Sequence, residues 1–220
     1  MISEIRRSKL LGRSQLVGGF KQTAGFGMIV RKNGIEQMRE QFPELWPFLQ
    51  FIIRENPSRL VQSSWRSIFQ QPSINAFYIN VLSMRHHHGV TRHVDATLQP
   101  ENITQKTIPR AVSVLYLSSP KNAGGNLRIF VNQILHSEVT PEPGLVVHFR
   151  GNLSHEITAV ENTSHERLSL VCEQYVLPQK ILGQLPPFQI QSRALDPIFD
   201  QAASELSFKD RLRSKPNHQD

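Results

Sequence analysis

Cysteine and long apolar runs are scarce in this 220-residue sequence. It has a single cysteine, Cys172, so an internal disulfide framework is excluded. A lone thiol beside Val171 in an apolar run is typical of a buried, inert side chain and fits a reducing compartment, here expected to be the cytoplasm. No apolar run approaches the roughly 20 residues that span a bilayer, and we expect no membrane association. The sequence after the basic pair Arg6-Arg7 is too polar and glycine-rich for an export signal.

A basic stripe interleaved with aromatic residues is also lacking. The formal net charge is +7 and the pI is about 9.9, which alone would suit an acidic partner such as nucleic acid. The positive residues are scattered in small groups, for example Arg31-Lys32 and Lys209-Asp210-Arg211. This distribution favours solvated surface charge and disfavours nucleic acid as a partner.

The order of apolar residues predicts a helical first third followed by many strands. Apolar residues between 35 and 53 recur at helical spacing, with Pro43 and Pro47 dividing them into two helices, and Asn56-Pro57 is suited to begin a third. Strand-like runs with few intervening helical patterns indicate a sandwich or jelly roll with the helices outside one sheet. The expected strands cover residues 25–30, 74–84, 93–98, 108–118, 127–131, 145–149, 155–160 and 167–177.

The length and 39% hydrophobic content suit one domain over residues 1–220. Within it we expect a helical N-terminal region over 1–73, a β-rich core over about 74–177 and a C-terminal extension over 178–220. Asp196-Pro197 could begin a helix in that extension, and residues 211–220 read as a polar tail.

Candidate metal ligands occur in two separate segments. In Arg92-His93-Val94-Asp95, His93 and Asp95 are two positions apart and would share one side of an extended strand. His155 begins another apolar run and supplies a third ligand. Two His and one Asp on three corners of a metal form the facial triad of non-haem iron(II) oxygenases. Twelve residues later Arg167 offers the planar fork that suits a buried carboxylate.

Other histidines have ordinary alternatives. The run His86-His87-His88 cannot direct three side chains to one side of a strand, so we interpret it as a solvated loop, with substrate contact as the rival reading. His148 and His165 are interpreted as strand or turn residues. Taken singly, His93 and His155 would also be read as satisfied polar residues, and it is Asp95 and Arg167 that favour a metal site.

At these motifs the chain resembles the 2-oxoglutarate- and iron(II)-dependent dioxygenases, within them the prolyl-4-hydroxylase-like branch. The resemblance covers roughly residues 74–177 and implies an α+β, mainly β, fold: a double-stranded β-helix (jelly roll) with N-terminal helices packed on one sheet. Its segments are the His93-Val94-Asp95 pair, a strand, Gly-Gly turn and strand around Gly124-Gly125, the approach to His155, and Glu166-Arg167-Leu168-Ser169.

The resemblance implies Fe(II), 2-oxoglutarate as cosubstrate and O2, with ascorbate as a further candidate. It assigns His93, Asp95 and His155 to the metal and Arg167 to the remote carboxylate of 2-oxoglutarate. Ser169, on the same strand face as Arg167, could add a hydroxyl. The tyrosine that many relatives place near the cosubstrate is missing before His93. Its candidate substitutes are Tyr78 and Tyr116.

The expected function is therefore a dioxygenase that hydroxylates a peptide side chain or a small amino-acid-like molecule and releases succinate and CO2. One alternative keeps the cofactors and demethylates nucleic acid. Another is a binding module that retains the jelly roll without catalysis, since fold alone does not imply function.

Overall fold

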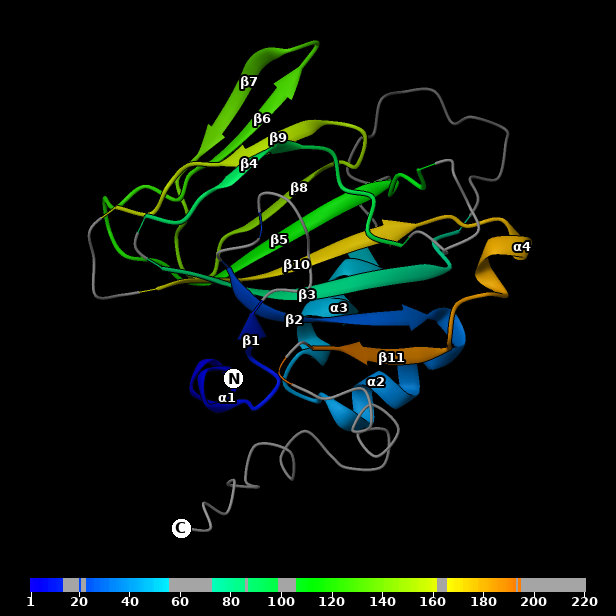
Figure 1. Ribbon diagram of the computed structural model, residues 1–220. Helices are drawn as coiled ribbons and strands as arrows, with labels where there is room; N and C mark the ends of the chain where they lie inside the picture. Colours follow the sequence, from blue (N-terminus) through cyan, green and yellow to red (C-terminus); the bar gives the residue numbers. More distant parts are fainter. Residues whose placement is uncertain are drawn as a thin grey trace, which may run out of the picture.

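The computed structural model describes residues 1–13, 20, 23–55, 73–85, 87–98, 106–161, 166–192 and 194 (Figure 1). Several expected features lie outside these residues: the helix beginning at Asn56-Pro57, the helix beginning at Asp196-Pro197, the tail over 211–220, and two of the histidines, His86 and His165.

Two antiparallel sheets form the body of the protein (Figure 1). The major sheet has the order β1-β2-β3-β10-β5-β8, with β11 also paired to β2, and the minor sheet has the order β4-β9-β6-β7. This arrangement is a double-stranded β-helix and confirms the expected jelly roll. The major-sheet strands are β1 (Gly12–Arg13), β2 (Ala24–Arg31), β3 (Ala76–Met84), β10 (Arg167–Tyr175), β5 (Ala111–Ser118), β8 (Val146–Arg150) and β11 (Phe188–Gln191); the minor-sheet strands are β4 (Val90–His93), β9 (Ser154–Ile157), β6 (Leu127–Val131) and β7 (Ile134–Val139).

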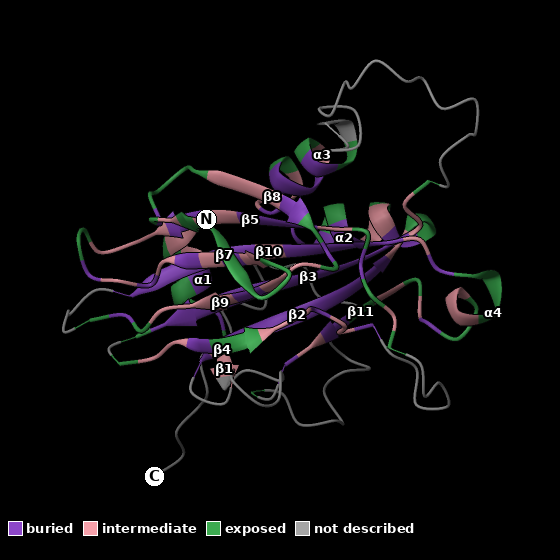
Figure 2. Cartoon of the chain, turned by 90° about the horizontal axis from the view of Figure 1, so that it is seen from above, coloured by how far each residue is buried: buried purple, intermediate pink, exposed green. Residues whose placement is uncertain are grey.

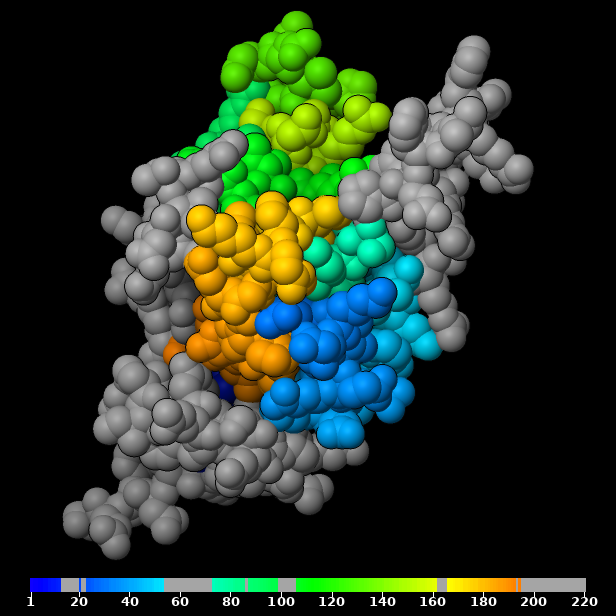
Figure 3. All heavy atoms as spheres, turned by 90° about the vertical axis from the view of Figure 1, so that its right-hand side faces the viewer, coloured from blue at the N-terminus to red at the C-terminus, as the bar shows by residue number. Residues whose placement is uncertain are grey.

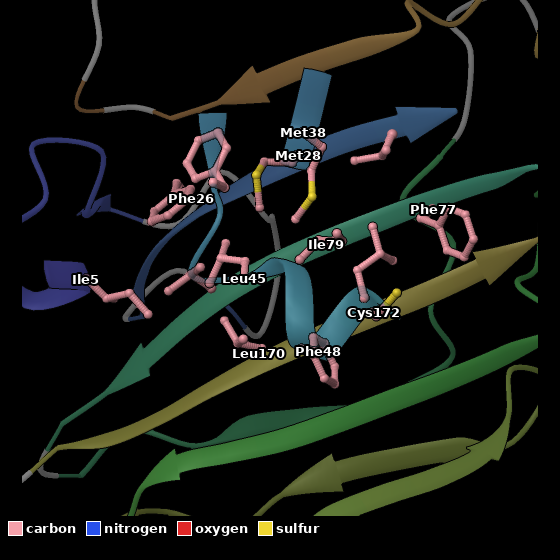
Figure 4. Close-up of a cluster of buried hydrophobic side chains, with 14 of the residues drawn as sticks. Ile5, Phe26, Met28, Met38, Leu45, Phe48, Phe77, Ile79, Leu170 and Cys172 are labelled. Atoms are coloured by element: carbon pink, nitrogen blue, oxygen red, sulfur yellow. The ribbon is translucent and has the colours of Figure 1, made fainter. Parts of the chain in front are cut away.

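Helices cover one face of the major sheet, because the strands direct alternate apolar residues toward them. The helices on this face are α1 (Ile2–Arg7), α2 (Ile35–Gln41) and α3 (Trp46–Glu55), whereas the short α4 (Gln179–Leu182) packs with Ile29, Tyr78 and Tyr175 of the other face. Figure 4 shows Met38 of α2 and Phe48 of α3 packed with Ile79, Leu170 and Cys172 of the sheet. Cys172 is fully buried in this cluster, as the sequence predicts.

The division of the helical stretch is also confirmed. α2 ends at Gln41, two residues before Pro43, and α3 begins at Trp46. Pro47 lies in the first turn of α3, where its missing N–H has no intrahelical partner to lose.

The opposite face of the major sheet looks toward the minor sheet and encloses a second apolar layer. Val112, Val114 and Tyr116 of β5 pack there against Leu127 and Ile129 of β6. In Figure 2 the strands β3 and β10 of the major sheet are coloured largely as buried. This inner layer surrounds the candidate site described below.

One predicted strand needs correction, and some observed strands are not predicted. The strand expected over 93–98 ends at His93, because β4 pairs with β9 only as far as His93 opposite His155. The structure also adds β7 and β11, which the sequence does not predict. In β7 the apolar Ile134 and Leu135 are adjacent and exposed, so the strand lacks alternation. β11 is four residues long and directly follows Pro186-Pro187.

The β6–β7 hairpin stands at one end of the molecule, away from α2 (green and blue, Figure 3). None of the helices within the described ranges is long and apolar enough to cross a membrane.

Candidate metal and cosubstrate site

Two histidines face each other across neighbouring strands of the minor sheet. In the β4–β9 ladder His93 is the direct partner of His155, and directly opposed side chains on one face lie close together. Their ring centroids are 4.3 Å apart. Register therefore brings together two residues that are 62 positions apart in the sequence.

Asp95 completes the group from the segment that follows β4. Its Oδ1 lies 3.3 Å from His93 Nε2, and its Oδ2 lies 3.4 Å from His155 Nε2. The three candidate ligand atoms all lie within 4.8 Å of one another. Ligand atoms about 2.1 Å from one metal and at right angles are ~3 Å apart, so this spacing suits one ion.

Both imidazoles have the orientation that a metal ligand needs. Nδ1 of His93 lies 2.8 Å from the Thr91 carbonyl oxygen, and Nδ1 of His155 lies 3.2 Å from the Leu153 carbonyl oxygen. A ring that donates from Nδ1 to a carbonyl leaves the Nε2 lone pair for the metal. His93 Nε2 and Asp95 Oδ2 are buried without a hydrogen-bond partner among the described residues.

The electrostatics of this group favour a cation. Burial lowers the pKa of His93, but the nearby Asp95 carboxylate and the Thr91 carbonyl outweigh it, so the net pKa is raised. Burial, together with the charge of His93, lowers the pKa of His155 despite Asp95. Asp95 is only 8% exposed, and a positive charge among these three groups compensates its burial. The residues thus fit an iron(II) ion in donor set, spacing and charge.

Arg167 is a buried cation at the start of β10. It is 1% exposed, and its Nη1 lies 3.4 Å from Met84 Sδ and 3.3 Å from Ser169 Oγ. Burial lowers the pKa of Arg167, yet a guanidinium stays protonated in proteins. Among the described residues no carboxylate pairs with it, and its Nε has no hydrogen-bond partner. An anionic ligand would satisfy both the charge and the free donor.

One pocket joins the two groups. It contains His93, Asp95, His155 and Arg167, and its volume is about 440 Å³ with the open mouth included. The space between a candidate metal and a buried guanidinium is what a dicarboxylate requires. The remaining lining residues are mainly apolar: Phe20, Asn80, Leu82, Val112, Val114, Leu127, Ile157, Val171 and Glu173.

The two tyrosine candidates lie in different places. The Arg167 Cζ is 4.9 Å from the centroid of the Tyr116 ring, and the buried Tyr116 hydroxyl has no hydrogen-bond partner among the described residues. Tyr78 faces a different cluster, and a Cβ on Gly27 would meet its hydroxyl. The structure therefore brings Tyr116 and Ser169 to Arg167, and it does not bring Tyr78 there.

Among the described histidines, His87, His88 and His148 do not line this pocket. His87 and His88 are in the turn between β3 and β4, where His87 is exposed and has a φ of 61°. His148 is a residue of β8, as expected, and its Nδ1 lies 2.7 Å from Ser113 Oγ.

Two residues of the pocket, Glu173 and Phe20, are not predicted from the sequence. Glu173 is six positions from Arg167 on the same face of β10, so counting every second residue from Arg167 could have identified it. Phe20 makes an edge contact with the His93 ring at 5.0 Å between centroids, and no local pattern predicts that contact.

Gly125 is the closest backbone neighbour of the Arg167 side chain. It has a φ of +70°, and a Cβ there would lie 2.8 Å from Arg167 Cδ. We expect Gly125→Ala to strain the backbone by about 1 kcal/mol and to displace the guanidinium, weakening 2-oxoglutarate binding several-fold. Calorimetric titration of 2-oxoglutarate measures the change.

Gly144 provides a matched control for that substitution. Its φ is +88°, but a Cβ there meets nothing within 4 Å. Gly144→Ala should lower stability through the backbone alone and keep 2-oxoglutarate affinity at the parent value. Equal losses of affinity in the two variants would contradict the contact with Arg167.

An ion pair between Arg6 and Glu166 holds helix α1 next to the start of β10. Arg6 Nε donates a short hydrogen bond to Glu166 Oε1, and Ser83 Oγ donates to Glu166 Oε2 at 2.6 Å. Burial raises the pKa of Glu166, but Ser83 and Arg6 outweigh it and the net pKa is lowered. A lowered folded-state pKa stabilises the fold above the unfolded value, and that stability is lost as pH falls through the folded value.

We expect Arg6→Ala to lower the free energy of unfolding by about 1 kcal/mol or less, because the Arg6 side chain is 44% exposed. The difference from the parent should shrink as pH falls through the lowered pKa of Glu166. Urea unfolding at pH 7 and pH 3.5 measures it. Arg7→Ala is the control, since the described residues offer Arg7 no ion pair; an equal loss there would point to the charge of α1 and not to Glu166.

The fold and the clustered His-Asp-His group define a jelly-roll protein with a candidate site for iron(II). Residues 79–172, which contain all three candidate ligands and Arg167, match the family model of the 2OG-Fe(II) oxygenase superfamily. The matched segment is shorter than half of the 220-residue chain, and over this segment the chain resembles the 2OG-Fe(II) oxygenases. No curated protein matches the sequence.

Solved structures match the chain at low identity and with TM-scores below 0.5. A prolyl-4-hydroxylase from Pseudomonas putida is 22% identical, with a TM-score of 0.43, over 60% of this chain and 66% of that one. A 2OG-Fe(II) family oxidoreductase from Burkholderia pseudomallei is 17% identical, with a TM-score of 0.46, over 70% and 66%. A Trichoplax adhaerens prolyl hydroxylase, solved with a peptide of hypoxia-inducible factor, is 14% identical, with a TM-score of 0.48, over 79% and 77%. The chain thus spans just under two thirds of the first two proteins.

Proposed function

We propose that this protein is an Fe(II)- and 2-oxoglutarate-dependent hydroxylase of the prolyl-4-hydroxylase-like branch, and that residues 1–220 form one such domain. Its substrate would be a peptide side chain or a small amino-acid-like molecule. The observation that carries the proposal is that buried polar atoms without partners gather in and beside one pocket: His93 Nε2, Asp95 Oδ2, Arg167 Nε and the Tyr116 hydroxyl. These atoms need a cation at one place and an anion at another.

In this proposal His93, Asp95 and His155 would hold the iron. Bound there with 2-oxoglutarate and O2, iron supplies oxidative decarboxylation of the cosubstrate to succinate and CO2, coupled to hydroxylation of the substrate. The Thr91 and Leu153 carbonyls keep the two imidazoles in the tautomer that coordinates through Nε2.

The cosubstrate would be oriented by residues of the major sheet. Arg167 would pair with its remote carboxylate, and Tyr116 could donate its free hydroxyl to the same group. Ser169, whose hydroxyl accepts from Arg167 Nη1, would fix the plane of the guanidinium. The apolar walls, such as Leu82, Val114 and Ile157, would exclude water from the reacting centre.

Succinate formation tests the proposal. The purified protein is incubated with Fe(II), 2-oxoglutarate and a panel of peptides and amino acids, and succinate is measured with and without iron. We expect iron-dependent succinate that increases with a hydroxylated substrate. A protein that binds iron and 2-oxoglutarate without any succinate on any substrate would be a binding module. Turnover only on methylated nucleic acid would make it a demethylase.

A further inference from the structure

The segment that carries Asp95 is held by β10 and not by its own sheet. The β4–β9 ladder ends at the His93–His155 pair, so residues 94–98 have no strand partner. Two residues along, Thr97 Oγ1 donates to Glu173 Oε1 at 2.6 Å, and Thr97 N donates to Glu173 Oε2 at 3.3 Å. Ladder bonds are thus replaced by bonds to a side chain of the major sheet.

Tyr175 adds a second pair of bonds to the same segment. Its hydroxyl oxygen accepts from Thr97 N at 3.1 Å and from Leu98 N at 3.3 Å. The same hydroxyl donates a short hydrogen bond to Glu173 Oε2. Glu173, Tyr175 and Thr97 therefore form one closed hydrogen-bonded group, which we call the β10 clamp.

Burying a carboxyl group costs free energy, and the hydrogen bonds of the clamp offset that cost for Glu173. Glu173 is 3% exposed, and no cation pairs with it among the described residues. Burial, followed by the charge of Asp95, raises its pKa to about 8. Among the described residues, its side chain accepts hydrogen bonds from Thr97 and Tyr175, so its partners lie in the clamp and not in the open pocket.

We propose that Glu173 and Tyr175 are positioning residues that fix residues 94–98 so that Asp95 faces His93 and His155. This inference rests on the proposed role of Asp95 as a metal ligand. Because Asp95 lies only two residues before Thr97, displacement of the Thr97 backbone would move the carboxylate relative to the two imidazoles. Supporting groups of this kind typically affect metal affinity about 10- to 100-fold.

Metal titration of clamp variants tests the proposal. Co(II), which reports its ligand geometry through visible absorption, is titrated into the metal-free full chain, and the thermal midpoint of each metal-free variant is recorded. We expect Glu173→Ala and Tyr175→Phe to weaken Co(II) binding about 10- to 100-fold and to alter its spectrum. Glu173→Gln should retain most of the affinity, because its amide oxygen can still accept from Thr97.

Ser113→Ala is the matched control. Its hydroxyl is fully buried on the other face of the major sheet, where it bonds with His148 and accepts from Gln174 Nε2. This variant should lose stability and keep the Co(II) affinity and spectrum of the parent. Tyr175→Phe, which removes a single oxygen, keeps the test decisive where Glu173→Ala does not fold.

Two failures are distinguishable. Clamp variants that lower the thermal midpoint but bind Co(II) with the affinity and spectrum of the parent would overturn the positioning role alone. A folded parent that binds no Co(II), and no Fe(II) under anaerobic conditions, would overturn the proposed function and this inference with it.

Discussion

Asp95→Ala is expected to abolish iron(II) binding and turnover while the fold persists. The substitution removes the only carboxylate of the His-Asp-His group and leaves two imidazoles 4.3 Å apart between centroids. It also removes a carboxylate whose burial is costly without a metal, so the metal-free protein should lose little stability. Anaerobic Fe(II) titration, succinate formation and circular dichroism measure the three quantities.

His93→Ala and His155→Ala should behave in the same way, whereas His148→Ala should not. His148 is a histidine of comparable exposure to His93, but it lies on β8 and contacts Ser113 and the Phe51 ring. It therefore controls for loss of an imidazole as such. Turnover by the Asp95→Ala protein at the parent rate would show that the ligand assignment is wrong.

Arg167→Ala is expected to weaken 2-oxoglutarate binding by roughly 30- to several-thousand-fold. Removing one partner of a buried charged pair costs on the order of 2–5 kcal/mol, and each 1.4 kcal/mol is tenfold in affinity. The guanidinium is fully enclosed by Met84, Ser169 and Tyr116, so water replaces it poorly. Titration of 2-oxoglutarate into the Fe(II)-loaded protein gives the change directly.

Arg167→Lys distinguishes the contribution of the positive charge to 2-oxoglutarate affinity from that of the planar guanidinium. Lysine keeps the charge but not the planar fork, so its loss of affinity should be smaller than that of alanine. Iron affinity should hardly move in either variant, because Arg167 contacts none of the three candidate ligands. Unchanged 2-oxoglutarate affinity in Arg167→Ala would remove this residue from the site, and a parallel loss of iron would make it structural.

The difference between Tyr116 and Tyr78 shows where sequence reasoning stops. Both lie on inward faces of the two strands that flank β10 and are equal candidates by pattern. In the β10 ladders Tyr116 pairs with Ser169, next to Arg167, while Tyr78 pairs with Glu173, six residues away. Register between strands decides which tyrosine lies beside Arg167, and register depends on contacts that no local motif encodes.

The metal ligands were predictable for the opposite reason. His93 and Asp95 are close in sequence, and His155 and Arg167 begin apolar runs, so short motifs locate them. The β10 clamp, by contrast, joins residues 76 and 78 positions apart across two segments. The contact of Gly125 with Arg167 likewise depends on how a turn lies over a side chain from a distant strand.

The two sheets divide the candidate site between them. His93 and His155 belong to the minor sheet, and Arg167 belongs to the major sheet. A cosubstrate that contacts both the metal and Arg167 links metal binding to cosubstrate binding. If the metal raises the affinity for 2-oxoglutarate by some factor, 2-oxoglutarate raises the affinity for the metal by the same factor. Binding of the metal and binding of 2-oxoglutarate would therefore be coupled across the gap between the two sheets.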